Sequence, residues 1–322
     1  LCRNHWLNIE GMFMSEGKYR LVTRSDFDGL VCAVLFKEMD MIDEIKFVHP
    51  KDMQDGTILV SENDITTNLP YVKGVHLAFD HHSSETVRLD EQSDDYIIDP
   101  DAPSAARVVY NYYGKDKLPD ISDEMMDAVD KSDSAQFSVD EILEPTGWVL
   151  LNYIMDARTG LGRYRDFSVS NYQLMMQLID YCRGHTVEEI LNLADVKERV
   201  DMYREHLEPA KEQIKRCTKV QGNLATLDLR YEDTIFATNR FILYALFPDT
   251  NISIHAIWGL NRLNTVYAVG KSIVNRTSNT NIGELMLTYG GGGHENAGTC
   301  QIENEDADTV LEELVKKITA DG

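Results

Sequence analysis

The feature that most constrains the fold is the alternation of short β-like runs with helical segments between residues 19 and about 133. The β-like runs cover residues 19–23, 45–48, 57–60 and 75–79, and an apolar helical segment follows the first run at residues 30–39. Such alternation is typical of parallel βαβ units. We therefore expect an α/β protein with an N-terminal doubly wound parallel sheet. Ligands of such sheets bind beyond the carboxyl ends of the strands.

The second half of the chain has a different pattern. Long helical segments occupy residues 141–219, and β-like runs return from residue 222 until a glycine cluster and a final helix at residues 306–319. We therefore expect a first domain at residues 14–190, a helical connector at 191–220 and a smaller α/β domain at 221–322. Residues 1–13 are expected to lie outside the fold.

Length, charge and cysteine content limit the functions that this chain can have. Its 322 residues suffice for two domains, and a formal net charge of −23 disfavours a grip on long duplex nucleic acid, although small anions remain compatible. No apolar run is long enough to cross a bilayer, so a membrane partner is not expected. Five dispersed cysteines without a CxxC pair favour reduced thiols and the cytoplasm.

Acidic and imidazole side chains follow several of the predicted strands. Asp26 and Asp28 follow the first run, Asp64 follows the third, and Asp80, His81 and His82 follow the fourth; Asp133 comes after the helical stretch DEMMDAVDK. An Asp-x-Asp-Gly alone is more often a solvated turn or a helix cap, and a lone His is usually structural. Gathered at one sheet edge, however, this oxygen-rich set suits Mn²⁺ or Mg²⁺, and two metal ions would offset the repulsion among the carboxylates.

The order of these motifs resembles the DHH phosphoesterase superfamily. The motifs are Asp-Phe-Asp-Gly, a post-strand Asp, Asp-His-His and Asp-Ser-Ala-Gln-Phe, and residues 289–298 resemble the glycine-rich motif of its DHHA1 substrate-binding domain. The resemblance covers residues 19–300 and implies that residues 14–190 form a metal-binding catalytic DHH domain and residues 221–322 a DHHA1-like substrate-binding domain.

The resemblance also implies roles for individual residues. A pair of Mn²⁺ ions would be bound by Asp26, Asp28, Asp64, Asp80, His81 and Asp133. Asp130 competes with Asp133, and Asn63 with Asp64. His82 would face the substrate and act in catalysis beside Asp80 and His81. Substrate phosphates would be held by Arg276, Gly291, Gly292, Gly293 and His294, with the glycines in a loop whose backbone amides approach the anion.

Two departures and one basic loop qualify this assignment. Many members of the superfamily carry a His where this chain has Val22, and its single-strand DNA exonucleases carry an Asp where this chain has Arg24, which leaves the first metal position short of a ligand. Arg158, Arg163 and Arg165 form either a solvated loop or a guide for the distal end of an anionic ligand.

The function that follows is a Mn²⁺-dependent, two-metal phosphohydrolase acting on terminal phosphates or phosphodiesters of short nucleotides, such as an oligonucleotide or 3′-phosphoadenosine 5′-phosphate. An exopolyphosphatase acting on inorganic polyphosphate is the alternative within the superfamily. A sensor that binds nucleotide or polyphosphate without turnover is the alternative of another class. The sequence leaves a homodimer open.

Overall fold

The computed structural model describes residues 17–82, 93–164 and 166–322. The extension expected at residues 1–13 lies outside the described residues. The chain divides into two compact units, Leu1–Ile121 and Ser122–Gly322. This division separates the first parallel sheet from the helices that follow it, whereas the sequence analysis assigned residues 14–190 to one domain. The domain boundaries stay a prediction.

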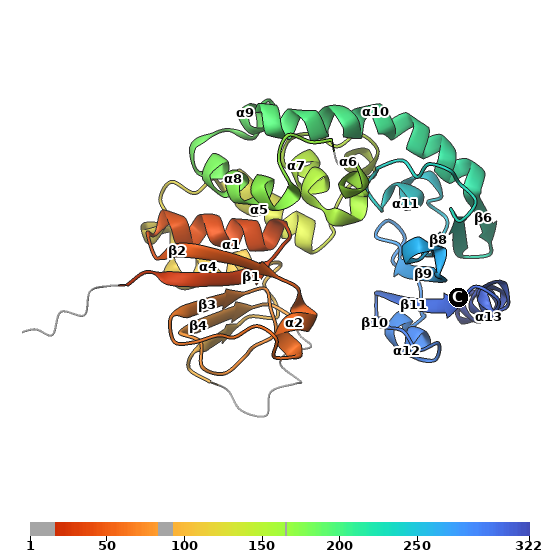
Figure 1. Ribbon diagram of the computed structural model, residues 1–322, viewed down its shortest axis with the longest axis horizontal. Helices are drawn as coiled ribbons and strands as arrows, with labels where there is room; N and C mark the ends of the chain where they lie inside the picture. Colours follow the sequence, from red (N-terminus) through yellow and green to blue (C-terminus); the bar gives the residue numbers. More distant parts are fainter. Residues whose placement is uncertain (1–16, 83–92, 165) are drawn as a thin grey trace, which may run out of the picture. The chain divides into compact units, whose positions relative to one another are not determined.

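A five-stranded parallel sheet forms the centre of the first unit, with strand order β2-β1-β3-β4-β5 (Figure 1). The strands are β1 (Tyr19–Arg24), β2 (Ile42–Val48), β3 (Asp64–Thr67), β4 (Leu77–Asp80) and β5 (Tyr96–Ile98). The predicted parallel sheet is therefore confirmed.

The helices of the first unit are α1 (Phe27–Glu38), α2 (Pro50–Gln54) and α4 (Ala105–Tyr113), with a 3₁₀ turn η1 (Lys115–Lys117). Helix α1 is buried on nearly every side, as its almost uninterrupted apolar sequence requires. It packs against β1 and α4. Gly29 makes this possible, because a Cβ there would collide with the carbonyl oxygen of Arg24. The start of α1 is thereby held directly at the end of β1.

The predicted strand at residues 57–60 is wrong. This segment has no strand pairing, and the third strand is Asp64–Thr67 instead. Ile58 and Val60 are partly buried against a cluster that includes Val22 and Met53. Their apolar character thus serves a loop that covers the sheet, and a strand is not needed to bury them.

The second unit begins with helices. They are α5 (Asp123–Asp133), α6 (Val139–Leu143), α7 (Gly147–Met155), α8 (Asn171–Gly184), α9 (Val187–Leu191) and α10 (Ala194–Cys217), with 3₁₀ turns η2 (Ala157–Thr159) and η3 (Leu161–Arg163) after α7. Capping boxes begin α6, α8 and α9, in each case with a Ser or Thr cap and a Glu or Gln three residues later.

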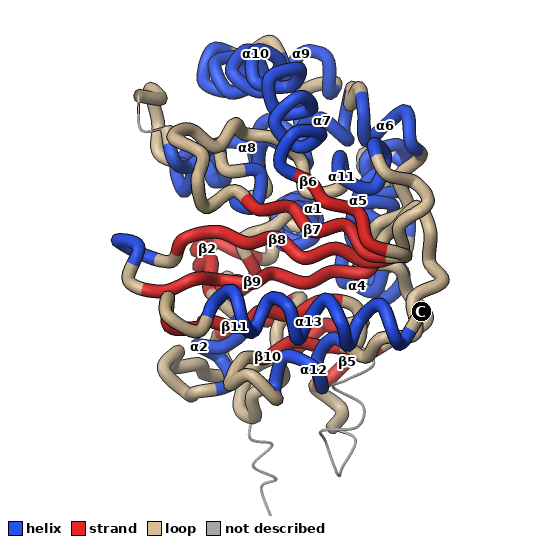
Figure 2. Tube along the Cα trace, turned by 90° about the vertical axis from the view of Figure 1, so that its right-hand side faces the viewer, coloured by secondary structure: helices blue, strands red, loops and turns tan. Residues whose placement is uncertain are grey.

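A mixed sheet completes the second unit, with strand order β10-β11-β9-β8-β7-β6. The strands are β6 (Thr218–Gln221), β7 (Leu224–Asp228), β8 (Ile252–Trp258), β9 (Asn264–Lys271), β10 (Gly292–His294) and β11 (Ala297–Glu303). The helices around it are α11 (Ile242–Leu246), α12 (Ile282–Leu287) and α13 (Ala307–Asp321), with a 3₁₀ turn η4 (Leu260–Arg262). Figure 2 shows α13 lying along this sheet, where Leu314 and Ile318 enter a core shared with the strands.

Two further expectations can be checked on the described residues. Cys32, Cys182, Cys217 and Cys300 are all free thiols. Within the described ranges, every helix is too short or too polar to cross a lipid bilayer.

Candidate metal centre and phosphate-binding residues

The carboxyl ends of β1, β3 and β4 meet at one edge of the parallel sheet. Thr23 pairs with Thr67, and Thr67 pairs with Phe79, so the three neighbouring strands end in register. The residues that follow these positions are therefore brought to the same edge. They include Asp26 after β1, Asn68 after β3 and Asp80 at the end of β4.

Asp26 and Asp28 both cap helices. Asp26 is the N-cap of α1, and its Oδ1 accepts a hydrogen bond of 3.0 Å from the amide of Gly29. Asp28 is 2% exposed and accepts bonds from the amides of Ala105 and Ala106 at the start of α4, at 3.0 and 2.8 Å. Each carboxylate is thus fixed in place by backbone donors, which suits an anionic group at a helix N-terminus.

Asn68 is the site residue that the sequence analysis missed. It is 1% exposed, adopts a left-handed conformation with φ of 54°, and donates from Nδ2 to Asp26 at 3.2 and 3.4 Å. Its Oδ1 is buried without a hydrogen-bond partner among the described residues. A buried polar atom of this kind needs an explanation, and a bound cation beside Asp26 provides one. The signal in the sequence is an Asn directly after the β-branched run Ile65-Thr66-Thr67.

Asp64 does not lie where the sequence analysis placed it. It is the first residue of β3 and therefore lies at the amino end of the strand, opposite the edge that carries Asp26. Its carboxylate accepts from Nε and Nη2 of Arg20 at 2.6 and 3.0 Å and from the amide of Ser61 at 2.6 Å. These contacts raise the pKa of Arg20, chiefly through the hydrogen bond to Asp64. The structure thus gives Asp64 a scaffold role, and Asn63 precedes it at the same end.

Asp80, His81 and His82 form a compact hydrogen-bonded group at the end of β4. Asp80 is 1% exposed, and its Oδ1 accepts from the amide of His81 at 2.8 Å and from Nδ1 of His82 at 2.7 Å. Nδ1 of His81 lies 3.2 Å from the carbonyl oxygen of Ala102. Because a carbonyl only accepts, the proton belongs on Nδ1 and the lone pair on Nε2, which is the arrangement of a metal-ligating imidazole. His82 has a 40% exposed side chain.

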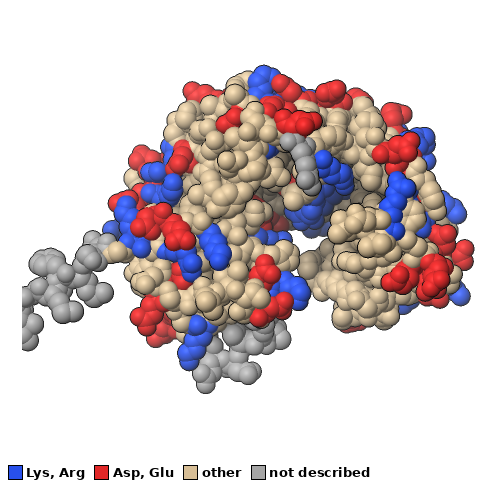
Figure 3. Space-filling model, viewed as in Figure 1, with Lys and Arg blue, Asp and Glu red and all other residues tan. Residues whose placement is uncertain are grey.

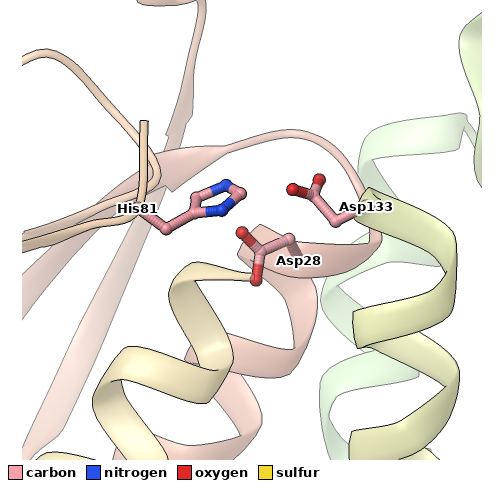
Figure 4. A group of neighbouring side chains, drawn as sticks. All are labelled: Asp28, His81 and Asp133. Carbon is pink, nitrogen blue, oxygen red and sulfur yellow. The ribbon is translucent and has the colours of Figure 1, made fainter. Parts of the chain in front are cut away.

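Asp28 and His81 come together at this edge. A carboxylate oxygen of Asp28 and a ring nitrogen of His81 lie within 4.8 Å of one another, a separation that one shared metal ion can span (Figure 4). Figure 4 also draws Asp133, the exposed last residue of α5, which belongs to the second unit. Asp130 lies one turn earlier in the same helix. The choice between Asp133 and Asp130 stays open.

The two departures from the superfamily pattern have physical partners in the first unit. Val22 is fully buried in an apolar cluster with Val48, Met53 and Leu69. Arg24 forms an ion pair with Asp26, with Nε 3.0 Å from Oδ2. Val22, at the position of the superfamily His, thus belongs to the apolar core in this chain. Arg24 adds a positive charge beside the carboxylate of Asp26.

The glycine run was expected to form a loop, and the structure corrects this. Gly292, Gly293 and His294 form strand β10, which pairs with β11, and the amide of Gly291 donates to the carbonyl of Met286 at 2.9 Å. Gly293 has φ of 155°, and a Cβ there would collide with the carbonyl oxygen of Ala297. The glycines therefore allow a close strand pairing, which leaves His294 exposed at the edge of the sheet.

The predicted substrate-binding arginines lie at two places in the second unit. Arg276 is exposed and donates from Nη2 to the carbonyl of Ala135 at 2.8 Å, two residues after Asp133. Arg158 lies in η2 and donates from Nε to Asp156 at 2.7 Å, and Arg163 is an exposed residue at the end of η3. Arg165 lies outside the described residues.

Comparison with known proteins identifies the family. No family model matches the chain. A solved structure of the pGpG-specific phosphodiesterase PggH from Vibrio cholerae is 60% identical in sequence, with a TM-score of 0.86, and the match covers 95% of this chain and 100% of that chain.

Two more distant matches carry less weight. RecJ from Thermus thermophilus, solved in complex with Mn²⁺, is 13% identical with a TM-score of 0.51, and the match covers 95% of this chain and 52% of that chain. This likeness shows the fold alone. The A-adding tRNA nucleotidyltransferase of Aquifex aeolicus is 28% identical over 145 residues, which are 41% of this chain and 17% of that protein. The chain thus matches only a small part of this curated relative.

The match to PggH extends over the whole of that protein, and the first unit presents Asp-His-His at the carboxyl end of a parallel strand. On these grounds the chain belongs to the DHH phosphoesterase superfamily of metal-dependent phosphoester hydrolases.

Proposed function

We propose that this protein is a phosphodiesterase that hydrolyses a short linear dinucleotide, with pGpG as its substrate. The observation that carries the proposal is the 60% identity to a pGpG-specific phosphodiesterase over that protein's full length. The carboxylates and imidazoles at the end of the parallel sheet supply the chemistry that such a reaction needs. This proposal narrows the short-nucleotide class expected from the sequence to one substrate.

Two Mn²⁺ ions are the proposed cofactors, with Mg²⁺ as a substitute. The proposed ligands are Asp26, Asp28, Asp80, His81 and Asp133. The donor set fits such ions because it is rich in oxygen, because Nδ1 of His81 is held by Ala102, and because Oδ1 of Asn68 is buried without a described partner. Bound divalent ions lower the pKa of water and neutralise charge on a phosphate. Asp64 is left out of this set because Arg20 and Ser61 already use its oxygens.

His82 is the residue proposed to contact the scissile phosphate. Its Nδ1 is held by Asp80 at 2.7 Å, which fixes the ring, while its 40% exposed side chain leaves the other edge accessible to a ligand. An imidazole oriented in this way can donate a hydrogen bond to a phosphate oxygen. Phosphate groups of the substrate are assigned to Arg276, His294, Arg158 and Arg163. The backbone amides of Gly292 and Gly293 are also assigned to these phosphates. The amide of Gly291 is left out because it is already bonded within the chain.

The test is a substrate panel assayed with Mn²⁺ and again after chelation with EDTA. The panel contains pGpG, a cyclic dinucleotide, 3′-phosphoadenosine 5′-phosphate and medium-chain polyphosphate. We expect rapid hydrolysis of pGpG only, loss of activity in EDTA and recovery on adding Mn²⁺. Asp80→Asn should lower kcat/KM about a thousandfold, equivalent to about 4 kcal/mol of transition-state stabilisation.

Lys51→Gln provides a control, since Lys51 on α2 forms an exposed i,i+4 ion pair with Asp55, the residue that follows the helix. It should leave kcat/KM within a factor of two. Turnover of polyphosphate in place of pGpG would make the protein an exopolyphosphatase. Tight binding of pGpG without turnover would make it a sensor. Either result rejects the proposed function.

A further inference from the structure

Arg240, which has no role in the chemistry above, lies beside the basic loop of the second unit. The amide of Thr238 donates to the carbonyl of Thr159 in η2 at 3.0 Å, which holds the segment before Arg240 against the loop that carries Arg158. Figure 3 shows Lys and Arg side chains gathered on the part of the second unit where α6 and α7 lie. Residues far apart in the sequence thus form one basic group.

The backbone around Arg240 is firmly held. Its neighbour Asn239 is 2% exposed, donates from Nδ2 to the carbonyl of Ile142 and to the hydroxyl of Tyr203, both at 2.9 Å, and accepts from the amide of Phe241 at 3.0 Å. The Arg240 side chain itself is exposed and lies over the ring of Phe241, 4.6 Å from its centroid. A guanidinium on such a fixed base is pre-organised to bind a ligand.

Among the described residues, Asp156 offsets only part of the positive charge of this group. Arg158 is paired with the carboxylate of Asp156, and its Nε lies 2.7 and 2.9 Å from the two carboxylate oxygens. Arg240 has no ion-pair partner among the described residues. The nearby Glu141 is already paired with Lys131 at 2.6 Å. A group with surplus positive charge therefore persists in a chain with 54 acidic and 31 basic residues.

The electrostatic surroundings of Arg240 agree with a surplus of positive charge in this group. Arg240 contacts solvent, but the protein atoms around it remove part of its hydration, and this desolvation together with repulsion from Arg158 lowers the pKa of Arg240 to about 10. Burial and the charge of Arg240 lower the pKa of His255 to about 4. Near neutral pH the group thus combines two charged guanidiniums with a neutral imidazole. A bound anion would relieve the repulsion between the two arginines.

We propose that Arg240 and Arg158 together form an anion site that binds the terminal phosphate of a linear dinucleotide. The proposal rests on the function proposed above and deepens it by assigning the source of its specificity. Two guanidinium groups present paired N–H donors that match the oxygens of a phosphate monoester. A dinucleotide such as GpG, which has the same phosphodiester but lacks the terminal phosphate, cannot use this site. Nor can a cyclic dinucleotide, which has no phosphate monoester.

The experiment compares pGpG with GpG on the full-length protein. Binding is measured by isothermal titration calorimetry in EDTA, and kcat and KM are measured separately with Mn²⁺. Arg240→Gln should weaken pGpG binding and raise its KM roughly ten- to a hundredfold, as expected for lost charged hydrogen bonds, while changing both quantities for GpG less than threefold. Arg240→Lys keeps the charge but loses the planar fork, so it should give an intermediate loss.

Arg183→Gln is the matched control, because Arg183 is an exposed arginine on α8 outside this group. Thermal unfolding checks that the Arg240 variants remain folded, and Arg158→Gln provides an independent variant with the same expected selectivity. Equal losses for pGpG and GpG, unchanged pGpG affinity, or no measurable pGpG binding to the unaltered protein would overturn the anion site. If pGpG binds selectively through Arg240 but is not hydrolysed, the anion site stands and the proposed phosphodiesterase fails.

Discussion

The two ends of strand β3 carry similar side chains with opposite surroundings. At the amino end, the oxygens of Asp64 accept from Arg20 and from the Ser61 amide. At the carboxyl end, Asn68 holds Asp26 with its amide nitrogen, while its buried oxygen has no hydrogen-bond partner among the described residues. A polar side chain that the chain itself satisfies stabilises the fold, and one left unsatisfied at a strand's carboxyl end indicates a ligand site.

The most sensitive test of this contrast is at Asn68. Asn68→Gly tolerates the left-handed backbone but removes the amide, so we expect kcat/KM for pGpG to fall roughly ten- to a hundredfold, as for loss of a group that orients metal ligands. Mn²⁺ affinity, measured by calorimetry, should fall in parallel. Asn68→Asp supplies an extra carboxylate to the cation and should increase that affinity.

Thr66→Val is the matched control for Asn68, because Thr66 also has a buried oxygen without a described partner but lies within the strand. It should leave Mn²⁺ affinity unchanged. If Asn68→Gly retains both Mn²⁺ affinity and activity, the contrast between the two ends of β3 has no functional meaning.

Asp64 should show the converse behaviour. Asp64→Ala removes the acceptor of charged hydrogen bonds from Arg20, so the free energy of unfolding should fall by about 2 kcal/mol. Urea denaturation followed by circular dichroism measures this loss. Mn²⁺ affinity of the folded fraction should stay within a factor of two. A large loss of Mn²⁺ affinity would return Asp64 to the metal centre.

The smallest expected effect extends the contrast to His255, whose imidazole has no hydrogen-bond partner among the residues that the structure describes. Its pKa is lowered to about 4 by burial and by Arg240, so between pH 6.5 and 4 the unfolded chain binds a proton that the folded chain does not. The free energy of unfolding therefore falls as the pH decreases through this range, and the effect is complete below about pH 4.

His255→Gln removes the imidazole that takes up this proton in the unfolded chain. When the pH is lowered from 6.5 to 5.5, the free energy of unfolding of the variant should therefore decrease by about 1 kcal/mol less than that of the unaltered protein. Urea unfolding at the two pH values measures the difference. Identical pH dependence in both proteins would show that His255 titrates normally in the folded state.

Much of the fold follows from local sequence pattern. The runs at residues 19–23, 45–48 and 75–79 correspond to β1, β2 and β4, and the doubly wound sheet that they predict is confirmed. Because the parallel strands of such a sheet end at one edge, the sequence also predicted that Asp26, Asp28, Asp80 and His81 lie at a common location. This part was predictable because each step depends on residues adjacent in the chain.

The errors arise where distant residues decide the outcome. Ile58 and Val60 have the apolar character of a strand, yet they pack as part of a loop on Val22. The sequence analysis took this segment for the third strand and therefore placed the strand end near Asp64, whereas the strand ends before Asn68. The glycine run was expected to be a loop, but Gly292, Gly293 and His294 pair with β11 and therefore form a strand. Asp28 caps a helix 77 residues away, and Arg240 joins Arg158 through a contact between separate segments. No local pattern encodes such pairings.

The hydrogen bond from Arg276 to the carbonyl of Ala135 joins two motifs that are 141 residues apart in the sequence. Asp133 lies two residues before Ala135, so the same guanidinium that is assigned to substrate phosphate also restrains the turn next to a proposed ligand. A phosphate that draws Arg276 away from Ala135 alters that restraint. Thermodynamic reciprocity then requires a cation that fixes Asp133 to change phosphate affinity by the same factor. Cation and substrate should thus bind as a linked pair, with heterotropic coupling built into a single side chain.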